Sequence, residues 1–446
     1  MKFTSFFSAK IFPILLVNFI GILGYSLVIP ILIFIVTDLG GNGFIYGLIG
    51  AMYPFFQFIG APILGKLSDR IGRKKVLVIS QAGTFFAWML FLLAFILPET
   101  VLWNQATNLT GTYTMTLPLL IIFLARIFDG FTGGNVSVAN AYLSDISTDE
   151  DRDKNFGLMG ASTSTGFVLG PAVAGLLAST FLGESLPLML AAAISLLAIF
   201  IINTRLKESN PCAVDTGTLS LRSFRKFFQV EQKECYDQSA EENNSPTWRS
   251  ILSIPGIPLL YAVYFLTFFG FSLFYAGLPI YANTLLDWNA TQLGVYLAYS
   301  SLIMILVQGP LLSRLSKRFS NQPLILIGSL CLACSFILLR FQSNFLLYAA
   351  ITVLSVGNGL MWPSFLSLLS KTGSKGMQGA IQGYGNSMGS IASMFGLVMG
   401  GVLFETLQTT VFTIGAGIFL IIVVLMSIHV YRKNNKSKHH PRVVNV

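Results

Sequence analysis

The amino-acid sequence predicts an all-α membrane protein with twelve transmembrane helices in two pseudo-symmetric six-helix bundles. Of its 446 residues, 54% are hydrophobic and only 11% are charged, whereas a soluble globular protein has about 25% charged residues. Apolar runs of roughly 20 residues, long enough to cross a bilayer as helices, recur along the chain. One long polar segment, residues 207–250, separates six of these runs from the other six.

The uninterrupted apolar runs indicate helices rather than a barrel, because a spanning segment must satisfy its own backbone hydrogen bonds. The first run, at 11–36, follows Lys2 and Lys10. It is too long for a signal-peptide core and is therefore interpreted as a permanent helix. The predicted spans are 12–37, 45–65, 76–97, 117–142, 156–180, 186–205, 255–282, 291–313, 322–340, 344–370, 377–402 and 410–431.

The distribution of Lys and Arg predicts the orientation. All 28 basic residues except Arg126, inside a span, and Arg340 fall on segments of one side. By the positive-inside rule, both termini are expected to be cytoplasmic. The protein is expected to lie in the cell inner membrane. The predicted domains are a first bundle (1–206), a cytoplasmic linker (207–250), a second bundle (251–432) and a basic cytoplasmic tail (433–446). Residues 221–228 of the linker form either an interfacial helix or part of a disordered segment.

A short basic turn, residues 65–75, joins the second and third spans. Gly65 and Gly72 permit close backbone approach and positive φ. We interpret this turn as a gating latch: Asp69 caps a helix of the other half, while the arginines, Arg70 and Arg73, bind acids at the inner end of the fourth span. Asp145 is the expected partner of Arg73. The alternative is that the turn only enforces topology. Residues 62–70 align without gaps on 310–318, where the acid and the glycines are lost.

Arg126 and Asp129 are the ionisable residues expected deep within the spans. Charges at this depth are costly, so they require a partner or a water-filled cavity. At positions i and i+3 the two side chains share a helix face and can pair. Asp129 is the candidate proton-coupling group, with Arg126 favouring its charged form and burial opposing it. A static structural pair is the alternative.

Glycines in the fifth span, at Gly166, Gly170 and Gly175, form a small-residue packing face, and Pro171 permits a kink. These motifs resemble known families. The 65–75 turn resembles the signature of the major facilitator superfamily. The Gly166–Gly175 motif, and residues 124–134 around Arg126, resemble the twelve-helix drug:proton antiporter branch, including the tetracycline-type exporters. The resemblance implies alternating access and proton-coupled export of a small amphipathic compound.

By analogy with that family, polar and aromatic residues of the central spans are expected to line a substrate cavity. They are Asn18, Tyr25, Gln57, Asn140, Tyr264, Tyr275, Gln308, Asn358, Trp362, Gln382 and Asn386. The second half has no acid inside a predicted span, since Asp287 and Glu405 lie at span ends. This pattern argues against a strongly cationic substrate and favours a lipophilic neutral or anionic one.

The sequence also argues against other classes. It contains no nucleotide-binding loop and no nucleophile–base pattern, so neither ATP-driven transport nor an enzyme is expected. No cofactor or metal is predicted, and Cys331 and Cys334 are interpreted as packing residues. The net charge of +9 is explained by basic loops rather than by nucleic-acid binding. The expected partners are a small-molecule substrate, protons and membrane lipid, and the chain is expected to be a monomer. Export of a metabolite or siderophore, solute import and a transport-inactive receptor remain alternatives.

Overall fold

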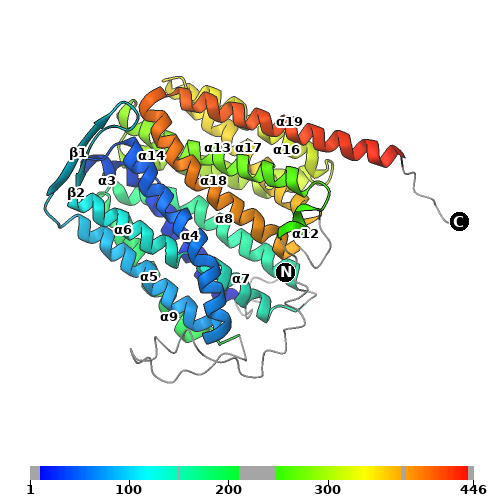
Figure 1. Cartoon of the computed structure of the whole chain (residues 1–446), viewed down its shortest axis with the longest axis horizontal. Helices are drawn as coiled ribbons and strands as arrows, with labels where there is room; N and C mark the ends of the chain where they lie inside the picture. Colours follow the sequence, from blue (N-terminus) through cyan, green and yellow to red (C-terminus); the bar gives the residue numbers. More distant parts are fainter. Residues whose placement is uncertain (1–10, 149–150, 210–247, 373–377, 440–446) are drawn as a thin grey trace.

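Two helical bundles, formed by the first and second halves of the chain, make up the computed structural model (Figure 1). The structure describes residues 11–148, 151–209, 248–372 and 378–439. The linker segment 221–228 lies outside these residues. Within the described part of the chain, eleven helices are long and apolar enough to cross a membrane, and a bent pair supplies the twelfth. The predicted number of spans is confirmed.

The first bundle consists of α2 (Phe12–Val28), α3 (Leu32–Asp38), α4 (Gly43–Ile71), α5 (Arg73–Ala94), α6 (Leu117–Thr132), α7 (Asn135–Ile146), α8 (Arg152–Ala178) and α9 (Ser185–Arg205). The first predicted span is not one straight helix: α2 and α3 meet at a 41° bend. Pro30 lies at this break, where it lacks the N–H that a continuous helix would need.

The second bundle consists of α12 (Trp248–Leu252), α13 (Ile257–Thr284), α14 (Ala290–Leu306), the π-helical η1 (Val307–Leu311), α15 (Leu312–Leu315), α16 (Asn321–Leu338), α17 (Asn344–Ser370), α18 (Gln378–Leu407) and α19 (Thr410–His439). The internal repeat is visible but imperfect. Pro62 lies inside continuous α4, whereas Pro310, its counterpart, lies within η1. Helix α19 also extends to His439, into the segment predicted as a polar tail.

A β-hairpin between α5 and α6 was not predicted. Strands β1 (Val101–Thr107) and β2 (Gly111–Thr116) pair antiparallel. The hairpin is fixed to the loop before α4, because Thr114 N–H donates to Gly40 O at 2.8 Å and the Asn42 side chain donates to Thr110 O at 2.6 Å. We call this end of the molecule the hairpin end, and the opposite end, which carries Gly72, the basic end.

The two bundles meet at the hairpin end and diverge toward the basic end (Figure 1). A methyl group at Gly47 of α4 would lie 2.5 Å from Leu397 O of α18, and one at Gly175 of α8 would lie 2.5 Å from Gly294 Cα of α14. Nearer the basic end, a methyl group at Gly160 or Gly383 would meet nothing within 4 Å. At these described positions, the halves touch backbone to backbone at the hairpin end and are further apart toward the basic end.

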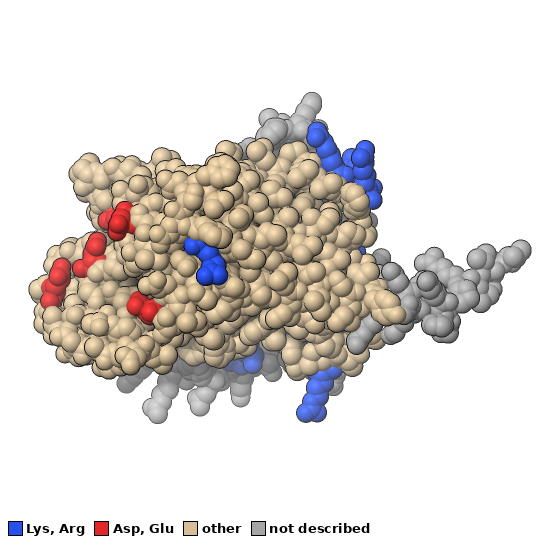
Figure 2. Space-filling model, turned by 90° about the horizontal axis from the view of Figure 1, so that it is seen from above, with Lys and Arg blue, Asp and Glu red and all other residues tan. Residues whose placement is uncertain are grey.

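Charge is unevenly distributed along the same axis. In Figure 2 the acidic residues in view gather toward the hairpin end, while most Lys and Arg in view lie closer to the opposite end. This asymmetry agrees with the uneven placement of basic residues in the sequence. The assignment of the basic end to the cytoplasm remains a prediction.

Candidate functional site

The charged pair expected inside the first bundle is present. Arg126 Nη1 lies 3.3 Å from Asp129 Oδ2, one turn apart on α6, and both residues are only 3% exposed. A second guanidinium donor, Nε of Arg126, has no hydrogen-bond partner among the described residues. A buried donor without a partner is costly. The pair is therefore incompletely satisfied in this conformation.

Three aromatic rings surround the Arg126 guanidinium. Its central carbon lies 5.4 Å from the ring centre of Tyr53, 5.6 Å from that of Tyr25 and 5.9 Å from that of Phe91. Each ring is within the range of a cation–π interaction. We call Tyr25, Tyr53 and Phe91 the aromatic box. The cation is thus stabilised by the ring faces as well as by the Asp129 carboxylate.

Sequence reasoning identified Tyr25 as a cavity residue but missed Tyr53 and Phe91. Both lie within long apolar runs of α4 and α5, where nothing in the local pattern separates them from packing residues. Only the three-dimensional packing of α2, α4 and α5 around α6 brings the rings together. Tyr53 is also tied to Gln57, whose amide lies 3.3 Å from the Tyr53 hydroxyl and donates to Gly133 O at 3.1 Å.

Small residues allow α4 to approach the charged pair closely. A methyl group at Gly130 would lie 2.5 Å from Tyr53 O, and one at Gly133 would lie 2.7 Å from the Tyr53 hydroxyl. Larger side chains at either position would push α4 away from α6. The absence of side chains at Gly130 and Gly133 therefore allows Tyr53 to lie against Arg126.

The predicted cavity residues of the first half occupy different environments. Asn18 is buried, and its amide donates to Ser162 Oγ at 2.7 Å and to Thr163 Oγ1 at 2.8 Å. Its polar group is therefore used in the contact between α2 and α8. Tyr25, Gln57 and Asn140 are partly exposed. The structure gathers Tyr25 and Gln57 near the charged pair, whereas Asn18 belongs to a helix–helix contact.

In the second half, Trp362 lies in an aromatic cluster with Tyr264 and Phe268, with ring centres 5.3 Å from each. The Tyr264 hydroxyl donates to Asn386 Oδ1 at 2.8 Å. Asn358 contacts the Met304 sulfur at 3.4 Å. Five of the predicted residues in this half are at least partly exposed: Tyr275, Gln308, Asn358, Gln382 and Asn386. The role of each in a substrate cavity remains a prediction.

At the basic end, Arg73 is the centre of a polar network. Its Nε donates to Asp145 Oδ2 at 3.1 Å, and its Nη1 contacts Asp69 Oδ1 at 2.5 Å and Ser68 Oγ at 2.7 Å. The expected Arg73–Asp145 pair is therefore present. Arg70 is exposed and forms no ion pair with a described residue. The expected cap of Asp69 onto the other half remains a prediction.

Two expectations about this segment need correction. The residues from 65 onward do not form an extended turn, because α4 continues to Ile71 and α5 begins at Arg73. Gly72 has the positive φ, at 107°, whereas Gly65 is helical. A methyl group added at Gly65 would lie 3.7 Å from Ser137 Oγ on α7. A single glycine thus makes the reversal.

Glu208 is a member of this network that the sequence did not indicate. Its carboxylate accepts from the backbone N–H of Arg73 at 2.8 Å and of Lys74 at 3.1 Å. An acid at a helix N-terminus satisfies free N–H groups and complements the helix dipole. Glu208 lies at the start of a polar linker, and its pairing with α5, 135 residues away, has no local signal.

The glycine motif of α8 packs against both halves. A methyl group at Gly170 would overlap Ser26 of α2, and one at Gly166 would lie 3.0 Å from Phe19 O. Ser26 Oγ donates to Gly166 O at 2.9 Å. Gly175, one turn beyond Pro171, instead contacts α14 of the second half. The motif therefore joins the first span to the contact between the bundles.

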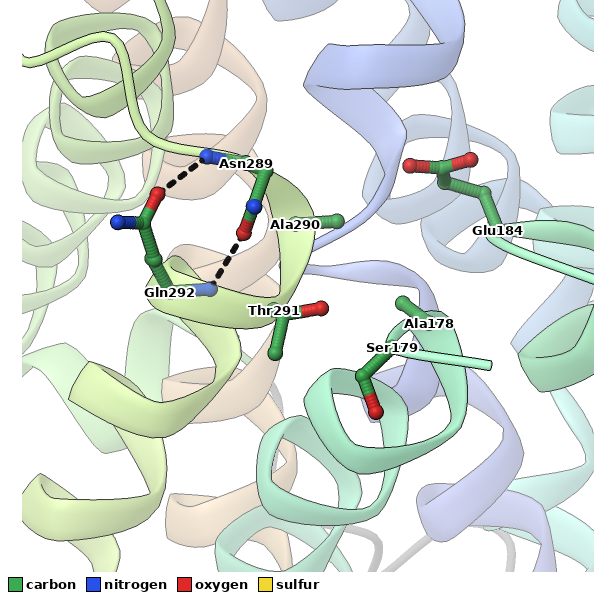
Figure 3. A pocket seen from close by; sticks show the side chains of 7 residues that line it. All are labelled: Ala178, Ser179, Glu184, Asn289, Ala290, Thr291 and Gln292. Atoms are coloured by element: carbon green, nitrogen blue, oxygen red, sulfur yellow. Dashed lines mark hydrogen bonds between the residues drawn. The ribbon is translucent and has the colours of Figure 1, made fainter. Parts of the chain in front are cut away.

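A shallow crevice of about 430 Å³ lies beside this contact, at the hairpin end. Figure 3 shows its lining at the end of α8 and the start of α14, where Asn289 and Gln292 satisfy each other's backbone groups in a capping box. It contains none of the predicted cavity residues. We therefore do not assign it to the substrate path.

Two helical bundles that meet at the hairpin end, with a buried charged pair inside the first bundle, form the architecture of a polytopic membrane transporter. The family comparison agrees: the model of the Major Facilitator Superfamily matches residues 14–396 and 260–444. The chain belongs to the major facilitator superfamily. It is a multi-pass membrane transporter and not an enzyme.

Relatives with assigned functions are similar over most of their length. The class C tetracycline resistance protein of Escherichia coli is 27% identical over 405 residues, covering 89% of this chain and 91% of the relative. Multidrug resistance protein 2 of Bacillus subtilis (strain 168) is 26% identical over 403 residues, covering 89% of each. The similarity to these drug resistance proteins thus extends through both halves.

Solved structures share the fold. A D-xylose-proton symporter superposes with a TM-score of 0.70 at 15% identity, covering 94% of this chain and 97% of the symporter. The human organic anion transporter MFSD10 (TETRAN) superposes with a TM-score of 0.63 at 19% identity, covering 93% and 98%. These similarities support the two-bundle architecture.

Proposed function

We propose that this protein exports a small amphipathic compound from the cell in exchange for protons, by alternating access. The observation that carries the proposal is the buried Arg126–Asp129 pair inside the aromatic box. A carboxylate held in the bilayer interior is costly unless it can be paired or neutralised. Asp129 can pair with Arg126 when it is charged and can be neutralised by a proton. These two states are what a group needs if it takes up and releases one proton in each cycle.

The aromatic box gives a physical reason why Asp129 can lose its charge. When a proton binds Oδ2, the ion pair with Arg126 is lost and the guanidinium remains a buried cation. The three ring faces then still stabilise it, each by roughly 0.5–1 kcal/mol. The box therefore keeps the guanidinium partly stabilised in both protonation states of Asp129, so the cation is not left without any favourable contact when the carboxylate is neutral.

The chemistry of the substrate determines the direction of coupling. A neutral compound that donates a hydrogen bond to the Asp129 carboxylate competes with the proton, and competition produces exchange. An anion that binds Arg126 would instead favour the protonated form of Asp129. Because coupling between two ligands is reciprocal, the proton and the anion would each strengthen the binding of the other. This positive coupling would produce cotransport. The similarity to drug exporters over both halves supports exchange, and solute import is the alternative.

The arrangement of the bundles supports alternating access. With the basic end in the cytoplasm, the close backbone contacts between the described parts of the two halves at the hairpin end correspond to an inward-facing conformation. We further propose that both termini are cytoplasmic, that the chain acts as a monomer in the cell inner membrane, and that residues 1–206 and 251–432 move as the two units.

Flux measurements in proteoliposomes test this function. Purified protein would be given a panel of lipophilic neutral and anionic compounds, with and without an imposed pH gradient. We expect the gradient to drive at least one neutral compound against the direction of proton flow. Flux in the direction of proton flow would indicate import, and flux that ignores the gradient would refute proton coupling. Absence of flux for every compound would favour a receptor.

A further inference from the structure

Glu405 bridges the two bundles at the hairpin end. It lies near the C-terminus of α18, and its Oε1 accepts a hydrogen bond of 2.7 Å from the backbone N–H of Gly43, the first residue of α4. Residue 43 belongs to the first half of the chain and residue 405 to the second. This hydrogen bond therefore crosses the interface that alternating access must open.

The N-terminus of α4 is a favourable position for this carboxylate. Its first N–H groups have no helical partner, and the helix dipole places partial positive charge there. The Asn42 side chain accepts from Ile45 N–H, which leaves Gly43 N–H to Glu405. Among the described residues no Lys or Arg pairs with Glu405. Its partner across the interface is a helix terminus.

The β-hairpin covers the same contact. A methyl group at Gly111 would lie 2.7 Å from Glu405 Oε2 and 2.9 Å from Asn42 Nδ2, and Gly111 has a φ of +68°. Because Asn42 also donates to Thr110 O, the hairpin tip, the α4 N-terminus and Glu405 form one cluster. The hairpin thus contacts the other half through a position that has no room for a side chain.

We propose that Glu405, Gly43 and Gly111 form an outer lock that holds the hairpin end closed. Glu405 acts as a positioning residue: it caps α4 only while the two bundles are together, and it must leave the cap when they separate. The hairpin tip keeps Glu405 directed at Gly43. This lock concerns the closure of the hairpin end and does not depend on the identity of the substrate or of the coupled ion.

Distance measurements between spin labels test the lock without any substrate. Phe181 and Phe345 lie at the hairpin end in opposite halves and are 95% and 80% exposed, so both positions can carry a label. The four native cysteines would be replaced by serine, and the full chain would be measured in lipid nanodiscs. In the parent protein we expect one dominant, short distance.

Glu405→Ala removes the acceptor, and Glu405→Gln keeps its shape but removes the charge. We expect the long-distance population to rise about two- to fivefold in Glu405→Gln, as for the loss of a charge at a helix N-terminus, and further in Glu405→Ala. Glu99→Gln is the matched control, because Glu99 is an exposed acid at the same end of the first half. An unchanged distribution in folded Glu405→Gln and Glu405→Ala would overturn the proposal.

A second pair of variants tests the hairpin separately. Gly111→Ala places a methyl group against Glu405, whereas Gly183→Ala has a similar positive φ, +54°, with nothing within 4 Å of the added atom. We expect the long-distance population to rise in Gly111→Ala only. Equal behaviour of the two variants would show that backbone strain alone is responsible and would remove the hairpin from the lock.

Discussion

Replacing Asp129 by Asn should separate coupling from transport. The amide keeps the size of the side chain and an oxygen that can accept from Arg126 Nη1, now 3.3 Å from the carboxylate, but it takes up no proton. Breaking a buried pair costs about 3–5 kcal/mol when the remaining charge is uncompensated. In the variant the amide oxygen can still accept from Arg126 and the three rings still contact the guanidinium, so the charge is not uncompensated, the cost should lie below this range, and folded protein is expected.

The expected effect on transport follows from the proton balance. If one proton is exchanged for one neutral molecule, a gradient of one pH unit supports about tenfold accumulation, since each unit corresponds to about 1.4 kcal/mol. In proteoliposomes the parent protein should approach this ratio. Asp129→Asn should reach a ratio of about one, while it continues to exchange labelled substrate down its gradient.

The control is Asp287→Asn, which removes the charge of an exposed acid. The backbone φ at this position is 51°, a conformation that asparagine tolerates. Its accumulation ratio should equal that of the parent protein. If Asp129→Asn still concentrates substrate, the Arg126–Asp129 pair is structural and another group couples the proton. If both exchange and accumulation are lost in folded protein, Asp129 is required for substrate binding as well.

Three further variants test the other parts of the site. Gly170→Ala should destabilise the protein by about 1–3 kcal/mol through overpacking against Ser26, seen as a lower unfolding temperature than in Gly157→Ala, where the added methyl group meets nothing within 4 Å. Asp69→Asn should abolish transport while the protein still inserts, and normal flux would refute the latch. Phe91→Leu should lower stability by roughly 0.5–1 kcal/mol through loss of one ring beside Arg126, whereas Phe200→Leu, at a position 63% exposed, should have little effect in thermal unfolding.

The architecture was predictable because the bilayer imposes a simple rule. Each span needs about 20 apolar residues, so the number of helices follows from the lengths of the apolar runs. The ends of the helices were less predictable. Helix α4 continues through Lys66, Asp69 and Arg70 to Ile71, because charged residues that leave the membrane can remain helical until a glycine at positive φ ends the helix.

The hairpin shows a different limit. Its strand β2 carries threonine at every second position from Thr112 to Thr116, a pattern that favours strands. The hairpin is nevertheless not expected from the predicted spans, because apolar runs give no information about the water-exposed segments that connect them. Its partners, Gly40, Asn42 and Glu405, are distant in sequence.

In the candidate site, the residues that could be predicted from the sequence are those whose burial costs free energy. Arg126 and Asp129 stand out because charge inside an apolar span demands an explanation, and Arg73 and Asp145 because opposite charges gather at one end. Tyr53, Phe91 and Glu208 were not found, since each is an ordinary residue in its own segment. Their importance comes only from what the folded chain places beside them.

Helix α4 connects the three polar centres of the structure. Its first residue, Gly43, is capped by Glu405 of the other half. Tyr53 in its middle covers Arg126, and Asp69 near its end pairs with Arg73. A helix of 29 residues is about 43 Å long, enough to reach both membrane surfaces. Under the proposed function, a proton on Asp129 removes the ion pair with Arg126, against which Tyr53 packs. Helix α4 therefore contacts the proposed coupling site and also carries residues of the proposed outer lock and of the proposed gating latch. Displacing α4 would act on the two ends together, which is the requirement that alternating access places on a gate.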